Sequence, residues 1–384
     1  MLFRSKRIPL SSRERQQRQG AFPYYGAQGI IDHIDDYIFD GRFILVAEDG
    51  ENLNSRKLPL ALMATGKFWV NNHAHIIRAK PEVADDIFLL HSLNFADIKP
   101  YVTGAAQPKL SQANLRLIKL AFPPLPIQRR IAGILSAYDD LIENSQRRIK
   151  ILEEMARRLY REWFVHFRFP GHEDCTFVES ALGEIPEGWE VRPFSALASY
   201  VNGYPFKPAQ LGKEGMPIIK IKELKAGIVA DTPRNSGENI PNKYHISDGD
   251  VLFSWSADLD VYLWRGGEGL LNQHLFNVLP ADGISRAFCF HALKESMPRF
   301  RALSLGATMH HIKRSALDQV FTVVDPGSIR NQFEELVNPI HIQLVTLTRH
   351  VLNLRRTRDL LLPRLLSGQI DVEALPDQAL MEGS

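Results

Sequence analysis

The sequence contains little of what marks a secreted, membrane-spanning or disulfide-bonded protein. Only two of the 384 residues are cysteines, Cys175 and Cys289. They lie far apart and match no disulfide framework, metal-ligand pattern or redox motif, so we expect reduced thiols. No run of about eighteen apolar residues occurs, and the basic N-terminus lacks the apolar centre of a signal peptide. We therefore expect a cytoplasmic protein with no membrane partner.

Loops that hold cofactors are also missing. The chain has neither a GxxxxGK[ST] loop for a nucleoside triphosphate nor a GxGxxG loop for a dinucleotide. His73 and His75 would share one face of a strand, as two zinc ligands could. No third ligand stands near them, which favours packed or hydrogen-bonded histidines. We expect no cofactor, no metal and no catalytic residue on this chain.

The charge of the chain is nearly balanced, with a formal net charge of +2. This value does not demand a nucleic-acid partner, because a duplex binder needs positive charge on one face and not in total. The first twenty residues nevertheless hold six cations against the single acid Glu14. Such a block is either a solvated terminus or a basic arm.

A long amphipathic helix is predicted from about Ile127 to Phe164. Apolar or small residues recur there every seven residues, and a second series follows each by four, which is the heptad pattern of a coiled coil. Pro126 stands near the start, where its missing N–H costs least. The predicted helix-pairing positions are Ile131, Leu135, Tyr138, Ile142, Ile149, Leu152 and Leu159.

The same pattern occurs a second time. An offset of 202 residues brings Pro326 onto Pro124, and the heptad continues in the same register. The second set of helix-pairing positions is Phe333, Val337, Ile340, Leu344, Leu347, Val351, Leu354 and Leu361. The preceding segments also repeat, as GAAQPKLSQANL with GATMHHIKRSAL, VNNHAHIIRA with LNQHLFNVLP, and DGRFILVAEDG with DGDVLFSWSA. We expect the last pair to begin with an Asp-Gly turn.

The chain is thus predicted to be α+β, with two pseudo-repeated α/β domains and two long helices packed as an antiparallel coiled coil. FWVNNHAHIIRA, MPIIKIKEL, GDVLFSWS and LLNQHLFNVL are expected to be strands. The best boundary lies between Pro170 and Pro186. Parallel helices would require this connector to travel back the full helix length. The predicted parts are domain 1 (1–122), helix 1 (123–168), a linker with domain 2 (169–325), and helix 2 with a C-terminal tail (326–384).

Three segments at the junctions between the predicted parts resemble those of a known family. PPLPIQRRIAGILSAYDDLIE before the first helix, LGEIPEGWEV at the start of domain 2 and LLPRLLSGQIDV near the end resemble the DNA-specificity subunit of type I restriction-modification systems. The resemblance covers nearly the whole chain and is most specific at the helices. It implies target recognition domains that each read one half of a bipartite asymmetric site on double-stranded DNA.

The resemblance also implies the partners. The long helices would set the spacing and dock two methyltransferase subunits, and a separate restriction and translocase subunit would complete the enzyme. S-adenosylmethionine, ATP and Mg would then bind only to partner subunits, which together act as an adenine-specific DNA methyltransferase and ATP-dependent endonuclease. The chain itself would perform no chemistry.

Candidate DNA contacts are basic and aromatic residues, since Arg and Lys bind phosphates and guanine while aromatic rings pack on bases or sugars. In domain 1 they are Lys6, Arg7, Arg13, Arg15, Arg18, Tyr24, Tyr25 and Lys109. In domain 2 they are Tyr204, Lys207, Lys213, Lys220, Lys222, His310, His311, Lys313 and Arg314. For any one of them the alternative is an ordinary solvated surface residue.

The two copies differ at their beginnings. Domain 2 opens with IPEGWEVRPFSALASYVNGYPFK, whereas domain 1 begins abruptly at MLFRSKRIPL without a strand that contains Trp. Domain 1 is therefore expected to be shortened at its N-terminus. This leaves an alternative function open, a methyltransferase-binding scaffold or truncated remnant that no longer reads DNA.

Overall fold

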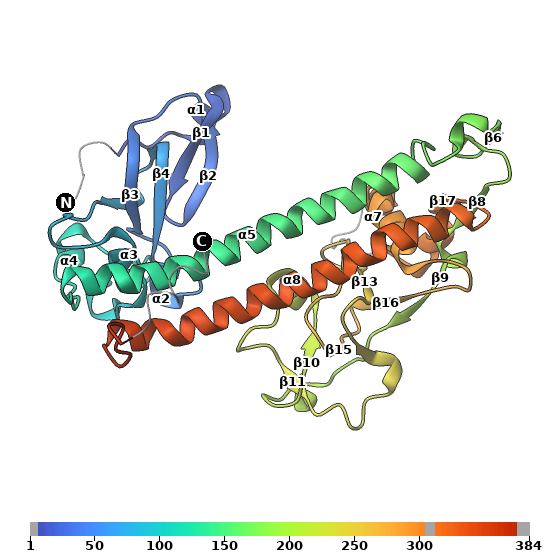
Figure 1. Cartoon of the computed structure of the whole chain (residues 1–384). Coiled ribbons are helices and arrows are strands. Elements are labelled where there is room, and N and C mark those ends of the chain that lie inside the picture. The colour runs from blue at the N-terminus through green and yellow to red at the C-terminus, as the bar shows by residue number, and fades with distance from the viewer. Residues whose placement is uncertain (1–6, 304–311, 375–384) are drawn as a thin grey trace. The chain divides into compact units, whose positions relative to one another are not determined.

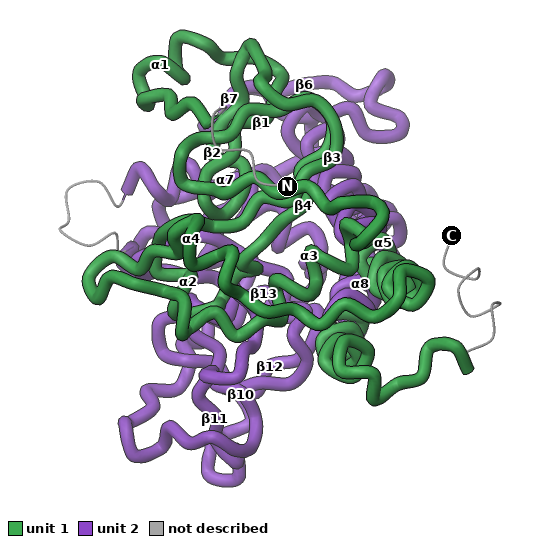
Figure 2. The backbone as a smooth tube through the Cα atoms, turned by 90° about the vertical axis from the view of Figure 1, so that its left-hand side faces the viewer, with its two compact units in different colours: residues 1–142, 354–384 green, residues 143–353 purple. Residues whose placement is uncertain are grey.

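The computed structural model describes residues 7–303 and 312–374 and has the mixed helix and strand structure that the sequence predicts (Figure 1). The chain divides into two compact units (Figure 2). Unit 1 comprises residues 1–142 and 354–384, and unit 2 comprises residues 143–353. The division points fall inside both long helices and not in the predicted linker. Each long helix therefore contributes one end to each unit.

The two predicted long helices are confirmed. α5 spans Leu125–Phe164 and α8 spans Ser328–Leu366. Asp325 caps α8, because its Oδ2 accepts hydrogen bonds from the backbone N–H groups of Ile329 at 3.0 Å and Arg330 at 3.1 Å. Within the described residues, no helix has both the length and the apolar character needed to cross a membrane.

The helices run antiparallel, as predicted. In unit 1, Ile131 and Leu135 near the start of α5 share a core with Leu365 near the end of α8. In unit 2, Phe164 at the end of α5 meets Phe333 near the start of α8, with ring centroids 5.2 Å apart. The start of each helix thus meets the end of the other.

The heptad positions face the interior to different degrees. Eight of them are buried, namely Ile131, Leu135, Ile142, Phe333, Val337, Leu344, Leu347 and Val351. The half-buried ones are Tyr138, Ile149, Leu152, Leu159, Ile340, Leu354 and Leu361. Which of these residues pair with each other across the two helices stays a prediction.

Unit 1 is built on one five-stranded sheet with the order β2-β1-β4-β3-β5. β1 and β4 are parallel, and the other neighbours are antiparallel. The strands are β1 Gln19–Gly26, β2 Gly29–Ile34, β3 Phe39–Ala47, β4 Ala61–Val70 and β5 Ala74–Ile77. The shorter helices are α1 Ser12–Gln17, α2 Asn52–Ser55, α3 Asp86–Phe95 and α4 Gln112–Leu115.

Unit 2 divides its strands between two four-stranded sheets, β11-β10-β15-β12 and β14-β13-β16-β9, and two strand pairs, β17-β8 and β6-β7. The first nine strands are β6 Phe177–Ser180, β7 Gly183–Pro186, β8 Glu190–Pro193, β9 Ala198–Asn202, β10 Met216–Ile219, β11 Arg234–Asn235, β12 His245–Ile246, β13 Val251–Ser254 and β14 Asp260–Leu263. The others are β15 Gly269–Leu271, β16 Leu275–Pro280 and β17 Phe321–Val324, with helices α6 Ile221–Ala226 and α7 Arg286–Leu303 and the 3₁₀ helix η6 Arg314–Asp318.

Strand pairing confirms the internal repeat. β1 runs parallel to β4 with Tyr25 opposite Val70, and β10 runs parallel to β15 with Ile219 opposite Leu271. The register of β3 with β5 likewise matches that of β13 with β16. A β-rich part followed by a long helix therefore occurs twice in the chain.

Three predicted strands are wrong in their extent. FWVNNHAHIIRA and LLNQHLFNVL each form two strands joined by a turn, β4–β5 and β15–β16. In both, an asparagine begins the turn, and the N–H of Asn71 and that of Asn272 donate to the preceding parallel strand at 3.0 Å. MPIIKIKEL ends as helix α6, because the buried carboxylate of Glu223 accepts from the N–H of Lys220 and from the hydroxyl of Thr232.

The expected Asp-Gly turns form in only one copy. Asp248 and Gly249 lie in a turn before β13. Asp40 and Gly41 instead lie within β3, where Gly41 pairs with Gly66 of β4. Gly41 and Gly66 have positive φ angles of 126° and 74°, a backbone conformation that favours glycine. They lie within the strand pair and do not reverse the chain.

A large apolar contribution to unit 2 comes from Phe333 of α8. Its side chain is fully buried and packs against the rings of Trp163 and Phe164 of α5. We predict that Phe333→Ala lowers the free energy of unfolding by about 3–5 kcal/mol, because it leaves a cavity at this seam. Urea denaturation followed by circular dichroism measures the change. The matched control is Leu336→Ala on the exposed side of the same helix, and an equal loss in both variants would contradict this packing.

Candidate nucleic-acid interface

The repeat brings the same three segments together in both units. These are the end of β3 or β13, the turn between β4 and β5 or β15 and β16, and the loop that precedes α4 or η6. The N–H of Leu110 donates to the carbonyl of Glu48 at 2.8 Å, and that of Ile312 donates to the carbonyl of Trp255 at 3.1 Å. We call the two places corner 1 and corner 2. Equivalent backbone contacts thus carry different side chains.

The loop of corner 1 is held by its own backbone. Lys109 and Thr103 exchange two hydrogen bonds, at 2.7 and 2.9 Å. Gly104 has a φ of 88°, and a Cβ at this position would lie 2.4 Å from the carbonyl oxygen of Gln107. The loop therefore needs glycine there, as the repeated GA dipeptide of the sequence indicates. These backbone contacts fix the direction in which the side chain of Lys109 projects from the loop.

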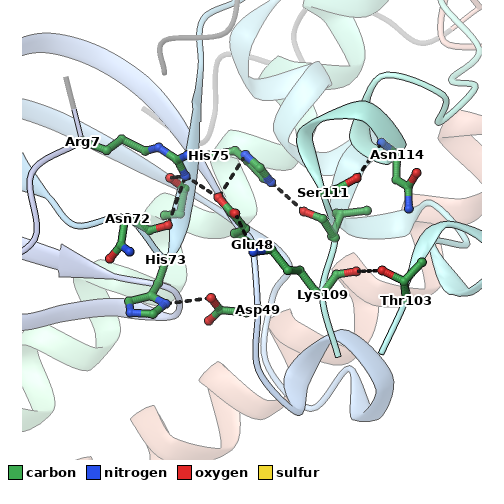
Figure 3. Close-up of polar contacts among 12 residues, drawn as sticks. Arg7, Glu48, Asp49, Asn72, His73, His75, Thr103, Lys109, Ser111 and Asn114 are labelled. Carbon is green, nitrogen blue, oxygen red and sulfur yellow. Dashed lines mark hydrogen bonds and ion pairs between the residues drawn. The ribbon is translucent and has the colours of Figure 1, made fainter. Parts of the chain in front are cut away.

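Corner 1 is a polar network centred on the carboxylate of Glu48 (Figure 3). Arg7 donates to Glu48 and also to the carbonyl of Ala74 at 3.0 Å. His75 lies on the other side, with its Nδ1 3.6 Å from Glu48 and its Nε2 2.7 Å from the carbonyl of Leu110. The ammonium of Lys109 approaches Oε1 of Glu48 at 3.5 Å. Three basic side chains thus surround one carboxylate.

These contacts set the charges of corner 1. Burial by itself would raise the pKa of Glu48, but the hydrogen bond from Arg7 and the nearby positive charges hold that pKa below its ordinary 4.5. Burial lowers the pKa of His75, so its ring is neutral at neutral pH and donates its Nε2 hydrogen to Leu110. Glu48 is therefore an ionised carboxylate of fixed orientation.

A recess of 370 Å³ opens above this network. Its walls are polar and offer hydroxyl, amide, ammonium and guanidinium groups to a ligand. They come from Arg7, Glu48, His75, Lys109, Ser111, Gln112, Ala113 and Arg116. This mixture suits a partner that presents both phosphate oxygens and hydrogen-bonding edges, as a nucleic acid does.

Corner 2 replaces this polar network with aromatic rings. Trp255 stands where corner 1 has Glu48, and its ring centroid is 5.9 Å from those of His274 and Phe276. The guanidinium of Arg314 lies over the ring of Phe276, 5.9 Å from the centroid, and donates to the carbonyl of Tyr200 at 3.0 Å. The equivalent corners therefore offer different chemistry to a ligand.

The basic N-terminal block is not the free cationic arm that its sequence suggests. Arg7 pairs with Glu48, Arg15 with Asp32 and Arg18 with Asp35, so these charges are largely matched within unit 1. Arg13 is exposed and forms no ion pair within the described chain. Lys6 lies outside the described residues. The acids that neutralise the block come later in the sequence, which is why a local count of charge missed them.

The prediction that Tyr24 and Tyr25 pack on DNA is wrong. Tyr24 is 1% exposed, and its hydroxyl accepts a hydrogen bond from the N–H of Leu10 at 2.8 Å. Tyr25 is 9% exposed and packs edge-on against Phe68. Both lie on β1 in the interior of the sheet, at positions where unit 2 has Ile218 and Ile219. Aromatic residues here serve the core.

The candidates of domain 2 fall into three groups. Lys207, Lys213 and Lys313 are exposed, as is Lys109 in unit 1. Others are engaged within the unit, namely Tyr204 with Phe206 and Tyr244, Lys222 with Asp231, Arg314 with Tyr200, and the half-buried Lys220. His310 and His311 lie outside the described residues.

Sequence reasoning missed Glu48, Trp255 and Gln112 as residues of the corners. His73 and His75 are hydrogen-bonded histidines, as the sequence favours, because Nδ1 of His73 lies 2.7 Å from Asp49 and Nε2 of His75 lies 2.7 Å from the carbonyl of Leu110. Among the described residues no group of three or more His, Cys, Asp or Glu side chains could hold a metal ion. The aligned turn of the repeat was the signal that could have located both corners.

The ion-pair network of corner 1 predicts a pH dependence of stability. Because Glu48 has a lowered pKa in the folded state, its contribution is complete above pH 4.5 and is lost as the pH falls through the folded pKa. The difference in unfolding free energy between wild type and Glu48→Gln should therefore shrink below pH 4.5, as chemical denaturation at several pH values would measure. Exposed Glu82→Gln is the control, and a difference that stays constant down to pH 3 would contradict the network.

Comparison with known proteins finds sequence similarity to one kind of protein. Residues 2–154 match the family model described as the type I restriction modification DNA specificity domain. The type I restriction enzyme MjaIX specificity subunit of Methanocaldococcus jannaschii is 24% identical over 295 residues, which cover 72% of this chain and 66% of that protein. A putative type I restriction enzyme specificity subunit of Haemophilus influenzae is 40% identical over 119 residues, 31% of this chain and 30% of that protein. The matched parts span less than two thirds of these two relatives.

A solved structure is similar over nearly the whole chain. The crystal structure of the S subunit of a type I restriction-modification system from M. genitalium aligns with a TM-score of 0.60, covering 95% of this chain and 93% of that one. At 14% sequence identity this likeness shows the fold alone.

Proposed function

We propose that this protein is the non-catalytic DNA-specificity subunit of a type I restriction-modification complex. Each unit reads one half of a bipartite asymmetric site on double-stranded DNA. The observation that carries the proposal is the pair of corners, which have equivalent backbone contacts and different side chains. Two recognition surfaces that share a backbone arrangement but carry different side chains suit a DNA site whose halves differ in sequence.

The proposal assigns a spacing role to α5 and α8. A base readout in two parts requires a fixed number of base pairs between the parts, at about 34–36 Å per turn of DNA. A continuous helix without a break serves this need better than a flexible linker. We also propose that the predicted helix-pairing residues hold α5 against α8. The parts of the chain would then have the predicted limits of 1–122, 123–168, 169–325 and 326–384.

We also propose which subunits this protein binds. Two methyltransferase subunits dock on the repeated helices, one for each copy of the repeat, and a restriction and translocase subunit binds the resulting complex. S-adenosylmethionine, ATP and Mg bind to those subunits. The duplicated design supports this stoichiometry, because two similar surfaces on one chain can receive two copies of one partner.

The direct prediction of this function is a methylation pattern. In a host that expresses the methyltransferase partner, deletion of the gene should remove adenine methylation from one split motif. Single-molecule sequencing of genomic DNA measures this, and restoring the gene should restore the motif. Methylation that is unchanged by the deletion would contradict the function and favour a scaffold that does not read DNA.

Phosphate contacts by exposed cations predict a salt dependence. Lys313 is exposed in the loop of corner 2. If it binds a phosphate, Lys313→Gln should weaken binding of the assembled complex to all duplexes alike and reduce the slope of log K against log salt by about 1. Fluorescence anisotropy at several salt concentrations measures the slope. Exposed Lys80→Gln, outside both corners, is the control, and an equal effect there would contradict a specific role for Lys313.

A further inference from the structure

The two oxygens of Glu48 have unequal surroundings. Oε2 is held by Arg7 and lies near His75. Oε1 has the ammonium of Lys109 at 3.5 Å, which is longer than a normal hydrogen bond. An ionised carboxylate offers about four lone-pair sites. Glu48 is thus fixed through one oxygen while the other retains the capacity to accept a hydrogen bond.

The carboxylate that carries this oxygen belongs to the wall of the recess. Glu48, Lys109 and Gln112 all line this space, and the Glu48 side chain keeps 13% of its surface exposed. The Lys109 side chain is 55% exposed, so its long flexible stem can turn outward at small cost. A phosphate of a bound duplex would attract it. Departure of Lys109 would uncover Oε1.

We infer that Oε1 of Glu48 accepts a hydrogen bond from the exocyclic amino group of a cytosine or an adenine in the half-site read by unit 1. This inference rests on the proposed function. Cytosine N4 and adenine N6 are the amino donors of the major groove, whereas guanine and thymine present acceptor oxygens there. A fixed carboxylate attracts the former and repels the latter. Arg7 acts as a positioning residue, because it holds Oε2 and leaves Oε1 to the ligand.

Corner 2 supplies the internal comparison. Trp255 occupies the place of Glu48 and Phe276 that of His75, since Phe276 pairs with Phe253 as His75 pairs with Val46. An indole ring offers no acceptor oxygen. Unit 2 therefore lacks this carboxylate reader at the equivalent place, and the inferred amino-group contact belongs to one half of the site.

The test removes the carboxylate and the amino group in turn. Once the methylated motif is known, the purified complex with its methyltransferase subunits is titrated with duplexes substituted at each position of the half-site read by unit 1. For wild type, one cytosine or adenine position should lose roughly ten- to hundredfold in affinity when replaced by a keto base. In Glu48→Met, which has nearly the same length but no acceptor oxygen, that ratio should fall to within about threefold of one, with other positions unchanged.

Single-group analogues identify the base. Purine in place of adenine, or 2-pyrimidinone in place of cytosine, removes only the amino group. One of these should weaken wild type several-fold and leave Glu48→Met unaffected, which is the coupling expected of a direct contact. Lys109→Gln is the matched control in the same recess and should weaken all duplexes alike without changing the preferred base.

The outcomes separate this inference from the proposed function. A wild-type complex without any sequence preference would overturn the function. A preference that Glu48→Met leaves unchanged, or lowers equally at every position, would overturn the inference alone. If Glu48→Met fails to assemble, Glu48→Asp keeps the charge on a shorter side chain. It should reduce the ratio at the same position, and an unchanged ratio would overturn the inference equally.

Discussion

The structure depends on the packing of α5 against α8, in which the start of each helix meets the end of the other. In unit 2, Phe333 packs against Phe164, and in unit 1, Leu365 shares a core with Ile131. An amphipathic helix in water must bury its apolar stripe. Because the stripe occurs twice in one register, the chain supplies its own partner helix, and each β-rich part is attached to both helices.

On this frame the two copies differ where a ligand would bind. Corner 1 places Glu48, His75 and Lys109 around a polar recess, whereas corner 2 places Trp255 and Phe276 on the same backbone positions. The buried helix contacts differ as well. Unit 1 has His91 3.3 Å from the carboxylate of Asp139, while unit 2 has His291 3.3 Å from His341, and burial lowers the pKa of those two rings to about 3 and about 4. The two copies of the repeat thus differ both in their buried helix contacts and at their corners.

The sequence predicted what depends on local periodicity. The limits of α5 and the repeat follow from heptads and from an offset of 202 residues, and the antiparallel helices follow from the length of the connector between them. The repeated turn marks the place of each corner, but the polar network could not be predicted, because Arg7, Glu48 and His75 come together only through sheet pairing between distant strands. For the same reason the burial of Tyr24 could not be predicted, since nothing local distinguishes an aromatic residue of a central strand from one that contacts a ligand.

The central claim is that one chain presents two readers to two halves of one DNA site. A photo-crosslinking amino acid introduced at position 48 or at position 255, in the assembled complex on a duplex with its methylated motif, tests this claim most directly. Position 48 should cross-link to bases of one half-site and position 255 to bases of the other. Cross-links from both positions to the same half-site, or to the spacer between the halves, would contradict it.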